Sequence, residues 1–265
     1  MLKRMLLLGV MLCTAAISVP FPALSVAQAA IPEMQPEDDI QASFNDENES
    51  AVLSKLKLKY PDVFIFHGNP NRKEIALTFD DAPDIRFTPQ ILDILKKYNV
   101  RATFFIVGTK AQKQRGLVKR IAEEQHEIGN HTYDHPFLPD LTMAEFERQI
   151  QKTHSILWNI TQVHAKYIRP PYGSIKESQL LWAANHHFKI INWNVDTLDW
   201  KGISGNSVYT NVFHQIRPGS IILQHAGGGV TSDLTGTIEA LPVIINTLLA
   251  KDFKFVTISE LLSHR

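Results

Sequence analysis

Short apolar runs alternate with longer amphipathic stretches from about residue 62 onward, and this alternation predicts the fold class. Seven of the runs have the length and composition of strands: 75–79, 102–107, 127–129, 167–168, 189–193, 220–223 and 255–257. The stretches between them run about 12 to 18 residues, which is typical of helices that cross between parallel strands. The pattern therefore predicts an α/β protein.

Local signals mark where several elements begin. A lysine–leucine alternation over 55–60 predicts a half-exposed strand, and the run 63–67, followed by the turn residues 68–71, predicts a hairpin. Three helix starts are expected at Thr88 with Pro89, Thr142 with Glu145, and Ser174 with Glu177, the last two as capping boxes.

Polar clusters follow the predicted strands, and their placement bears on the architecture. The clusters are Asp80-Asp81, Asn130-His131, Arg169, Asp196 and Gln224-His225. Strand–helix alternation fits an open doubly wound sheet or a closed barrel, and both place strand carboxyl ends on one face. Five polar clusters at the same ends of the strands favour a barrel in which the loops after the strands surround one active-site opening. We therefore expect a barrel of seven units, one short of the usual eight.

Composition restricts the class of protein. The chain has 265 residues, 44% hydrophobic and 20% charged, which suits one sizeable globular domain. Lys plus Arg equals Asp plus Glu at 27 each, so the basic excess of a dedicated nucleic-acid binder is absent. The single cysteine, Cys13, excludes a disulfide scaffold and a cysteine-based zinc site. A metal here must use histidine and carboxylate.

The first 29 residues predict a secretory signal peptide. Lys3 and Arg4 precede the apolar run 5–19, and small residues lead to an expected cut after Ala29. An uncleaved anchor and a lipoprotein signal at Cys13 are the alternatives, and the shortness of the run disfavours the anchor. We expect a secreted or cell-wall-associated protein with no stable membrane span once the signal is removed.

An acidic segment follows the signal. Residues 30–50 carry seven acidic residues and no Lys or Arg, which predicts a solvated tether. The expected domains are therefore a signal peptide at 1–29, an acidic tether and N-terminal extension at 30–62, and a single catalytic domain at 63–265. From residue 51 onward basic residues are in mild excess, which is compatible with work near an anionic wall.

Two neighbouring carboxylates, Asp80 and Asp81, end the first strand of the predicted barrel. The two negative charges repel each other and lose hydration at the end of an apolar strand. A metal ion offsets this cost by binding one carboxylate, and the other carboxylate can then act as a base. The structural alternative is that one Asp caps a turn before Pro83 while the other faces water.

His131 and His135 lie four residues apart, a spacing that suits two ligands of zinc or a similar ion. The alternative is that one caps a turn and the other packs under Pro136 and Phe137. Two histidines and one Asp leave coordination positions for water and substrate, as a catalytic site requires. The remaining histidines are expected at the surface or in caps: His126, His154, His164, His186, His187, His214 and His264.

Five ordered motifs carry a family resemblance. They are TFDDAP (78–83), HTYDHP (131–136), RPPYG (169–173), DTLDW (196–200) and ILQH (222–225). Their order and spacing over residues 70–262 resemble the polysaccharide deacetylase family, also called the NodB-homology domain or carbohydrate esterase family 4. Any one motif alone is weak, whereas five in order are specific. The resemblance implies a distorted (β/α)7 barrel, in agreement with the strand count.

The resemblance also implies roles for individual residues. Asp81, His131 and His135 correspond to a metal triad that usually holds zinc, with Co²⁺ or another divalent ion as alternatives. Asp80 corresponds to the general base and His225 to the general acid.

Further roles follow from the same resemblance. It assigns an oxyanion donor to the backbone N–H of Tyr172, and the orientation of Asp80 to Arg169. It gives Asp199 a part in fixing the Arg and His network. Trp200 and Leu223 would wall the pocket for the acetyl methyl group.

The chain departs from the family pattern at two places. Ala82 stands where many members have glycine, which restricts the backbone beside the metal ligand. Residues 226–229 follow His225 where many relatives continue with an acid, so an acidic partner of His225 must come from elsewhere.

The resulting expectation is a metal-dependent N-deacetylase that acts on N-acetylglucosamine in a cell-wall polysaccharide, with peptidoglycan first and chitin or chitooligosaccharide second. Three alternatives stay open: a hydrolase of small amides, a catalytically inactive wall-binding module, and an iron oxygenase that uses the same ligand set. The missing cupin-like strand pattern argues against the oxygenase.

Overall fold

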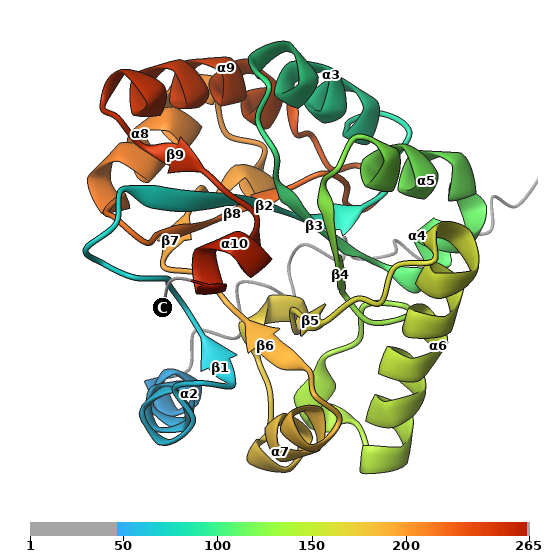
Figure 1. The fold of residues 1–265 in the computed structure, drawn as a ribbon. Coiled ribbons are helices and arrows are strands. Elements are labelled where there is room, and N and C mark those ends of the chain that lie inside the picture. Colours follow the sequence, from blue (N-terminus) through green and yellow to red (C-terminus); the bar gives the residue numbers. More distant parts are fainter. Residues whose placement is uncertain (1–46, 264–265) are drawn as a thin grey trace, which may run out of the picture. The chain divides into compact units, whose positions relative to one another are not determined.

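A computed structural model describes residues 47–263 of the chain, so the predicted signal peptide and most of the acidic tether lie outside the described residues. Its centre is a nine-stranded sheet in the order β1-β6-β5-β4-β3-β2-β8-β7, with β9 paired to β2 (Figure 1). The strands are β1 Phe64–Ile65, β2 Glu74–Ala82, β3 Thr103–Ile106, β4 Glu127–Asn130, β5 Tyr167–Ile168, β6 Lys189–Ile191, β7 Val195–Asp196, β8 Ile221–His225 and β9 Lys254–Phe255.

All ladders between these strands are parallel. Among residues 47–263 no ladder joins β1 to β7, so the sheet curls as a distorted barrel without closing between these two edges. The α/β class and the curled parallel sheet confirm the predicted fold. Each of the seven predicted strands is present, and the short strand β7 was not predicted.

Helices cover the outside of the curled sheet, except the last one, which lies on its inner side (Figure 1). They are α2 Glu47–Lys59, α3 Thr88–Tyr98, α4 Gly108–Lys113, α5 Arg115–Glu123, α6 Met143–Thr161, α7 Glu177–Asn185, α8 Gly205–Gln215, α9 Thr235–Ala250 and α10 Ile258–Ser263. In the part of the chain that the structure describes, three short 3-10 helices lie in the loops: η2 Leu138–Asp140, η3 Pro171–Gly173 and η4 Asp199–Lys201. Among residues 47–263, no helix combines the length and apolarity that a membrane span requires.

Strand β2 shows how the sheet separates its two faces. Ile75, Leu77 and Phe79 are fully buried in the large hydrophobic cluster that includes residues of α3, α5 and α9. Successive side chains of a strand point to opposite faces, so Ala76 and Asp80 face the other way, into the barrel. The polar end of β2 is thereby directed toward the interior of the sheet.

Helix α10 fills the interior of the barrel with apolar side chains. Ile258 and Leu261 pack in one buried cluster with Ala76, Phe105 and Ile221, which come from three strands. Full burial of one such side chain contributes about 1.5 to 3 kcal/mol. The interior is therefore a packed core, and the five polar clusters that the sequence analysis singled out lie at or beyond the carboxyl ends of the strands.

The strand predicted at 55–60 is wrong, because this segment belongs to helix α2. Leu53, Leu56 and Tyr60 recur at helical spacing, and they pack on the buried cluster that contains Phe64, where Leu56 is 5% exposed. Contact with that cluster decides the outcome, since a strand would place Leu56 and Tyr60 on one face but would leave Leu53 on the other. Hydrogen bonds from Tyr60 and Lys59 to Glu177 join α2 to α7.

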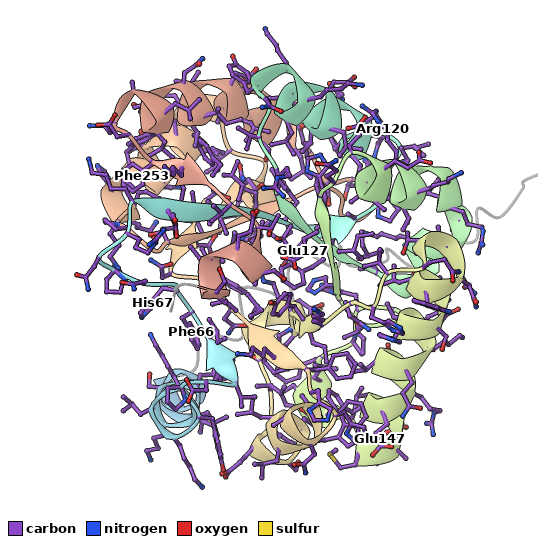
Figure 2. All side chains as sticks on the ribbon, in the orientation of Figure 1. Phe66, His67, Arg120, Glu127, Glu147 and Phe253 are labelled. Carbon is purple, nitrogen blue, oxygen red and sulfur yellow. The ribbon has the colours of Figure 1, made fainter. Side chains whose placement is uncertain are left out.

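The predicted hairpin at 63–71 is also wrong. Phe64 and Ile65 are nearly fully buried and pair in parallel with β6 rather than turning back onto β2. A strand buried on both faces suits a parallel neighbour, and its apolar run does not distinguish this from a hairpin. Phe66 and His67 follow the strand (Figure 2), and His67 forms an isolated antiparallel bridge with Ser220.

Two of the three predicted helix starts are confirmed. Helix α3 begins at Thr88 with a proline in its first turn. Helix α6 has the predicted capping box: Glu145 donates its N–H to Thr142 Oγ1 at 3.3 Å, and the Thr142 N–H donates to the Glu145 carboxylate at 2.9 Å. Ser174 does not start α7, because the chain stays extended for two more residues. The helix begins at Glu177, with Lys176 donating its N–H to Gln179 Oε1 at 3.0 Å.

Thr142→Ala is expected to destabilise the protein by about 1 kcal/mol, because it leaves the N–H of Glu145, in the first turn of α6, without its side-chain acceptor. Urea denaturation followed by circular dichroism measures this change. Thr210→Ala in α8 is the control, since its exposed hydroxyl bonds a carbonyl within the helix. Equal stabilities of wild type and Thr142→Ala would contradict the capping role.

Candidate metal centre and active site

Three predicted ligands meet at the carboxyl ends of β2 and β4. One ligand atom from each of Asp81, His131 and His135 lies within 4.8 Å of the others. Asp81 belongs to the end of β2, and the two histidines lie in the loop that follows β4. The imidazole rings of His131 and His135 lie 4.9 Å apart at 66°. The structure therefore brings together residues separated by 50 positions in the chain.

The backbone at this site is unusual. Asp81 has a φ of 61° and His135 a φ of 63°, and Thr132 between the histidines has 67°. Left-handed conformations cost non-glycine residues free energy and persist where surrounding contacts over-determine them. Here Gly108 donates its N–H to the Thr132 carbonyl at 3.0 Å. Two of these three positions, Asp81 and His135, are predicted metal ligands, and backbone strain of this kind is typical of functional sites.

The protonation of these side chains fits a metal. Burial, the largest influence, lowers the pKa of His131 and of His135 to about 4, so both imidazoles are neutral at neutral pH. His131 donates from Nδ1 to the Arg169 carbonyl at 2.7 Å, which leaves the Nε2 lone pair for a metal. Burial would raise the pKa of Asp81, but His135 and Lys110 outweigh it and lower the pKa.

Two neutral imidazoles and one carboxylate suit zinc and similar divalent ions. Three protein ligands leave at least one coordination position for water or substrate, as in catalytic zinc sites. The residues present therefore fit the metal that the sequence predicts.

Asp80 lies beside this triad on the inner face of β2. It is 4% exposed, and its Oδ1 accepts a hydrogen bond from Arg169 Nη1 at 2.8 Å. Its Oδ2 lies 3.8 Å from His131 Nε2, on the side of the proposed ligands. Burial raises the pKa of Asp80, against the opposing charges of Arg169 and His225. A carboxylate so placed can accept a proton from a group bound at the triad.

Arg169, whose predicted role is to orient Asp80, contacts this carboxylate directly. The fully buried guanidinium also donates to Thr78 Oγ1 at 2.7 Å and to the Ile191 carbonyl at 3.0 Å. Its Cζ lies 4.2 Å from the centroid of the Phe105 ring, so the group is confined on its apolar side as well. These contacts fix the position of the charge that faces Asp80.

His225 and Asp199 form a second polar pair in the site. His225 donates from Nδ1 to Asp199 Oδ1 at 2.7 Å and from its backbone N–H to Oδ2 at 2.9 Å. Burial would lower the pKa of His225, but Asp199 outweighs it and raises the pKa to about 9. At neutral pH His225 is therefore an imidazolium. Its Cα is the register partner of the Asp80 Cα on the neighbouring strand.

Asp199 supplies the acidic partner that the residues after His225 lack. It is 1% exposed, and Thr237 Oγ1 donates to its Oδ2 at 2.7 Å. The carboxylate of Asp199 accepts hydrogen bonds from His225 and Thr237, so it lies on the His side of the predicted network. Arg169 is held by other groups.

The remaining predicted residues lie around the same strand ends. The Tyr172 ring packs edge-on against His135 at 5.0 Å, and Tyr172 has a left-handed backbone with a φ of 59°. Leu223 is 3% exposed in β8, and Trp200 is half-buried in η4, with Lys201 Nζ 4.9 Å from the centre of its ring. The oxyanion role of Tyr172 and the pocket role of Trp200 and Leu223 stay predictions.

Comparison with known proteins agrees with this geometry. Residues 67–191 match the family described as polysaccharide deacetylase. A peptidoglycan-N-acetylglucosamine deacetylase of Bacillus cereus is 49% identical over 223 residues, which cover 84% of this chain and 79% of that protein. The chain belongs to the polysaccharide deacetylase family.

Solved structures of the polysaccharide deacetylase family show the same fold. The crystal structure of the Bc1960 peptidoglycan N-acetylglucosamine deacetylase, in complex with 4-naphthalen-1-yl-N-oxidanyl-benzamide, has a TM-score of 0.76 and 46% identity. The match covers 79% of this chain and 97% of that one. A carbohydrate esterase family 4 pseudoenzyme from Bacillus anthracis, BA3943, has a TM-score of 0.70 and 34% identity, over 75% and 68% of the two chains.

The motifs of this family do not reveal every residue that shapes the site. Thr78 begins the TFDDAP motif but was given no role, although strand alternation places it on the inner face of β2 with Asp80. Thr237 lies in α9, 38 residues from the Asp199 that it contacts, and no local pattern indicates it. Lys110 lies at the start of α4 and reaches Asp81, again without a local signal.

One histidine of this polysaccharide deacetylase was assigned wrongly. His126 is not at the surface: it is 7% exposed, packs against the Phe104 ring, and accepts the Ala102 N–H at Nδ1 over 3.2 Å. Burial lowers its pKa to about 4. The apolar layer beside β3 accommodates the neutral ring, which sequence spacing does not reveal. His264 lies outside the described residues, and the other five predicted surface histidines are exposed or half-buried.

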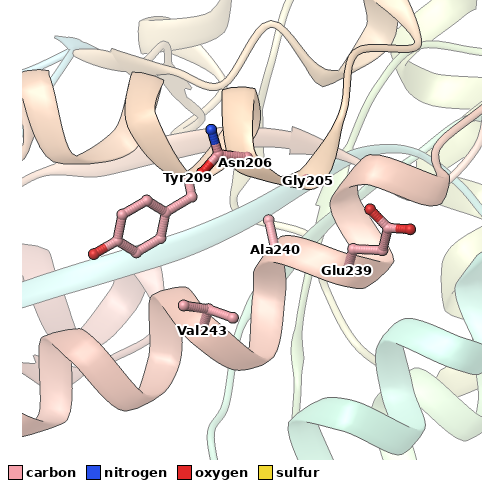
Figure 3. Close-up of a pocket in the computed structure, with 6 residues that line it drawn as sticks. All are labelled: Gly205, Asn206, Tyr209, Glu239, Ala240 and Val243. Atoms are coloured by element: carbon pink, nitrogen blue, oxygen red, sulfur yellow. The ribbon is translucent and has the colours of Figure 1, made fainter.

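A separate pocket lies between α8 and α9 of this family member (Figure 3). Its lining residues are Gly205, Asn206, Tyr209, Glu239, Ala240 and Val243. None of them belongs to the predicted site. The pocket is therefore not the proposed catalytic centre.

His131→Ala is expected to abolish stoichiometric metal binding, because one of three ligands is lost, while the barrel stays folded. Elemental analysis after dialysis against zinc, together with circular dichroism, measures both properties. His164→Ala is the control, since His164 is exposed and lies in the loop after α6. Unchanged metal content in His131→Ala would remove that residue from the site.

Proposed function

We propose that the protein is a secreted, metal-dependent deacetylase that hydrolyses the N-acetyl group of N-acetylglucosamine residues in peptidoglycan. One observation carries the proposal. Asp80, on one strand, lies beside the Asp81, His131 and His135 triad, while an imidazolium, His225, lies on the neighbouring strand. A base and an acid with opposite protonation on neighbouring strands suit the hydrolysis of an amide.

The metal is most simply Zn²⁺, held by Asp81, His131 and His135. An ion bound there supplies a Lewis acid and lowers the pKa of a bound water. Asp80, oriented by Arg169, accepts the proton as the water oxygen attacks the acetyl carbon. The buried guanidinium keeps this carboxylate fixed, so no reorganisation is needed at the moment of reaction.

His225 completes the reaction. An amine leaves poorly as its anion, so the C–N bond breaks as His225 donates its proton to the sugar nitrogen. The products are acetate and a free amine. Asp199 stabilises the imidazolium before transfer, in the manner of the buried carboxylate of a hydrolytic triad.

Tyr172, Trp200 and Leu223 are assigned to substrate binding. The backbone N–H of Tyr172 would donate to the developing oxyanion, a contribution of about 3 to 4 kcal/mol for one such donor. Trp200 and Leu223 would enclose the acetyl methyl group. The support is position, because Leu223 precedes Gln224 and His225 on the same strand and Trp200 follows Asp199.

The relatives support peptidoglycan as the first substrate, and chitin or chitooligosaccharide is second. The predicted signal peptide supports action outside the cytoplasm, in the secreted or cell-wall fraction. Sequencing the N-terminus of the mature protein from that fraction tests the location and the expected cut after Ala29. A protein retained in the cytoplasm with Met1 intact would overturn this part of the proposal.

The catalytically inactive alternative has a precedent in the pseudoenzyme relative. Against it, this chain retains Asp80, its Arg169 partner and all three ligands in one place. The sheet is built from parallel ladders, which supports hydrolysis over the iron oxygenase because a cupin-like strand pattern is antiparallel.

Acetate release decides between these functions. The zinc-loaded protein is incubated with peptidoglycan fragments, chitooligosaccharides and a small acetamide, and free acetate is measured without added cosubstrates. We expect release from peptidoglycan, and mass spectrometry then locates the new amine on glucosamine. Release from the small acetamide alone would favour the small-amide hydrolase, and no release at full metal occupancy would favour the binding module.

A further inference from the structure

Lys110 reaches the metal site from the beginning of α4. Its Nζ lies 3.6 Å from Asp81 Oδ1 and donates hydrogen bonds to the Asp81 carbonyl at 3.1 Å and to the Gly228 carbonyl at 3.4 Å. The side chain is 27% exposed, so its charge is partly shielded from water. One ammonium group thus contacts a proposed metal ligand and the loop that follows β8.

The helix that carries Lys110 is hydrogen-bonded to the loop between the other two proposed ligands, His131 and His135. Gly108 and Thr109 donate their N–H groups to the carbonyls of Thr132 and Tyr133, at 3.0 and 2.8 Å, in the loop between His131 and His135. Gly108 has no room for a side chain, since a Cβ there would lie 2.6 Å from Thr153 Oγ1. The start of α4 therefore holds a fixed position against both ligand-bearing segments.

The loop after β8 encloses the same point from the other side. A Cβ on Gly227 would lie 2.4 Å from the Asp81 carbonyl oxygen, so this glycine permits a close approach of the two backbones. Lys110 donates across that junction. The position of the Lys110 ammonium is therefore determined by three segments: the start of α4, the end of β2 and the loop after β8.

We propose that Lys110 is a counter-charge for Asp81 that competes with the metal, so that it stabilises the metal-free site and weakens metal binding. The inference rests on the proposed metal site. Without a metal, the buried Asp80 and the partly buried Asp81 are adjacent carboxylates, and a neighbouring ammonium offsets part of their repulsion. When a divalent cation binds Asp81, the ammonium and the cation repel each other at short range.

A second role for Lys110 predicts the opposite result. If the ammonium acts only by holding the backbone carbonyl of Asp81, its removal loosens a ligand and weakens metal binding. Charge and hydrogen bonding can be separated, because glutamine retains a donor without the charge and arginine retains the charge. Methionine removes both while keeping a similar length.

The experiment measures zinc affinity by competition with a chromophoric chelator for wild type, Lys110→Met, Lys110→Gln and Lys110→Arg. We expect zinc to bind Lys110→Met and Lys110→Gln about 10-fold or more tightly than wild type, and Lys110→Arg within about 3-fold. Lys113→Met is the matched control, because Lys113 is an exposed lysine at the end of the same helix, and its affinity should not change.

Thermal unfolding provides an independent readout. Without zinc, Lys110→Met should unfold at a lower temperature than wild type, and saturating zinc should reduce or reverse the difference because it binds the folded variant more tightly. Equal or weaker zinc binding by both neutral variants would overturn the inference. Lys110→Gln decides the matter if Lys110→Met fails to fold. A wild-type protein that binds no zinc would instead refute the metal site.

Discussion

Asp80→Asn is expected to lower kcat by about 100-fold or more while the protein retains its metal, because asparagine cannot accept the proton of the attacking water. Asp81, His131 and His135, and not Asp80, would supply the ligand atoms of the proposed metal site, so metal content should stay stoichiometric. Acetate release at full zinc occupancy, with metal analysis of the same sample, measures both properties.

The buried partner of Asp80 makes a stability control necessary. Arg169 loses its carboxylate in Asp80→Asn, and an uncompensated buried charge can destabilise a protein by about 3 to 5 kcal/mol. The rate should therefore be measured well below the unfolding temperature of the variant. Asp134→Asn is the matched control, since Asp134 is an exposed aspartate in the loop between the two histidine ligands. Retention of more than a tenth of the wild-type rate by folded, metal-loaded Asp80→Asn would exclude Asp80 as the base.

The rate of the wild-type enzyme is expected to fall at alkaline pH, because the acid form of His225 is lost as pH rises through about 9. Asp199→Asn removes the charge that raises this pKa, so the alkaline limb should move toward the ordinary histidine value of about 6.5. At pH 8 the protonated fraction would then fall about 30-fold, and the rate with it. A pH–rate profile of kcat for both proteins measures the shift.

Two further variants complete this test. Asp233→Asn, an exposed aspartate in the loop after β8, should leave the alkaline limb in place. His225→Ala should remove the limb altogether. If Asp199→Asn slowed the reaction without moving the limb, Asp199 would be structural and the acid would lie elsewhere.

The raised pKa of His225 also means that its protonated form stabilises the folded protein. That contribution is complete below about pH 6.5 and is lost as pH rises through about 9.

The errors in the N-terminal part of the fold share one physical cause. The segments around Leu56 and Phe64 have short apolar patterns that fit more than one element, and contacts with α7 and β6 decide between them. The Ser174 prediction failed for a related reason, since a capping box is a local pattern, whereas the 3-10 helix before Ser174 leaves the chain extended. Thr142, whose box precedes a long amphipathic helix, behaved as predicted.

The sequence by itself determined the α/β class, the seven strands and the chemical identity of the site, because strand periodicity and the residue types at strand ends are local properties. Only the tertiary structure decided how those residues are paired. It places Thr237 against Asp199, gives His225 its acidic partner, and brings Lys110 to Asp81. Such contacts join segments far apart in the chain, and their distances depend on how the strands curl and how the helices pack. A sequence pattern specifies which groups are present, and packing sets the charges and hydrogen bonds that each group meets.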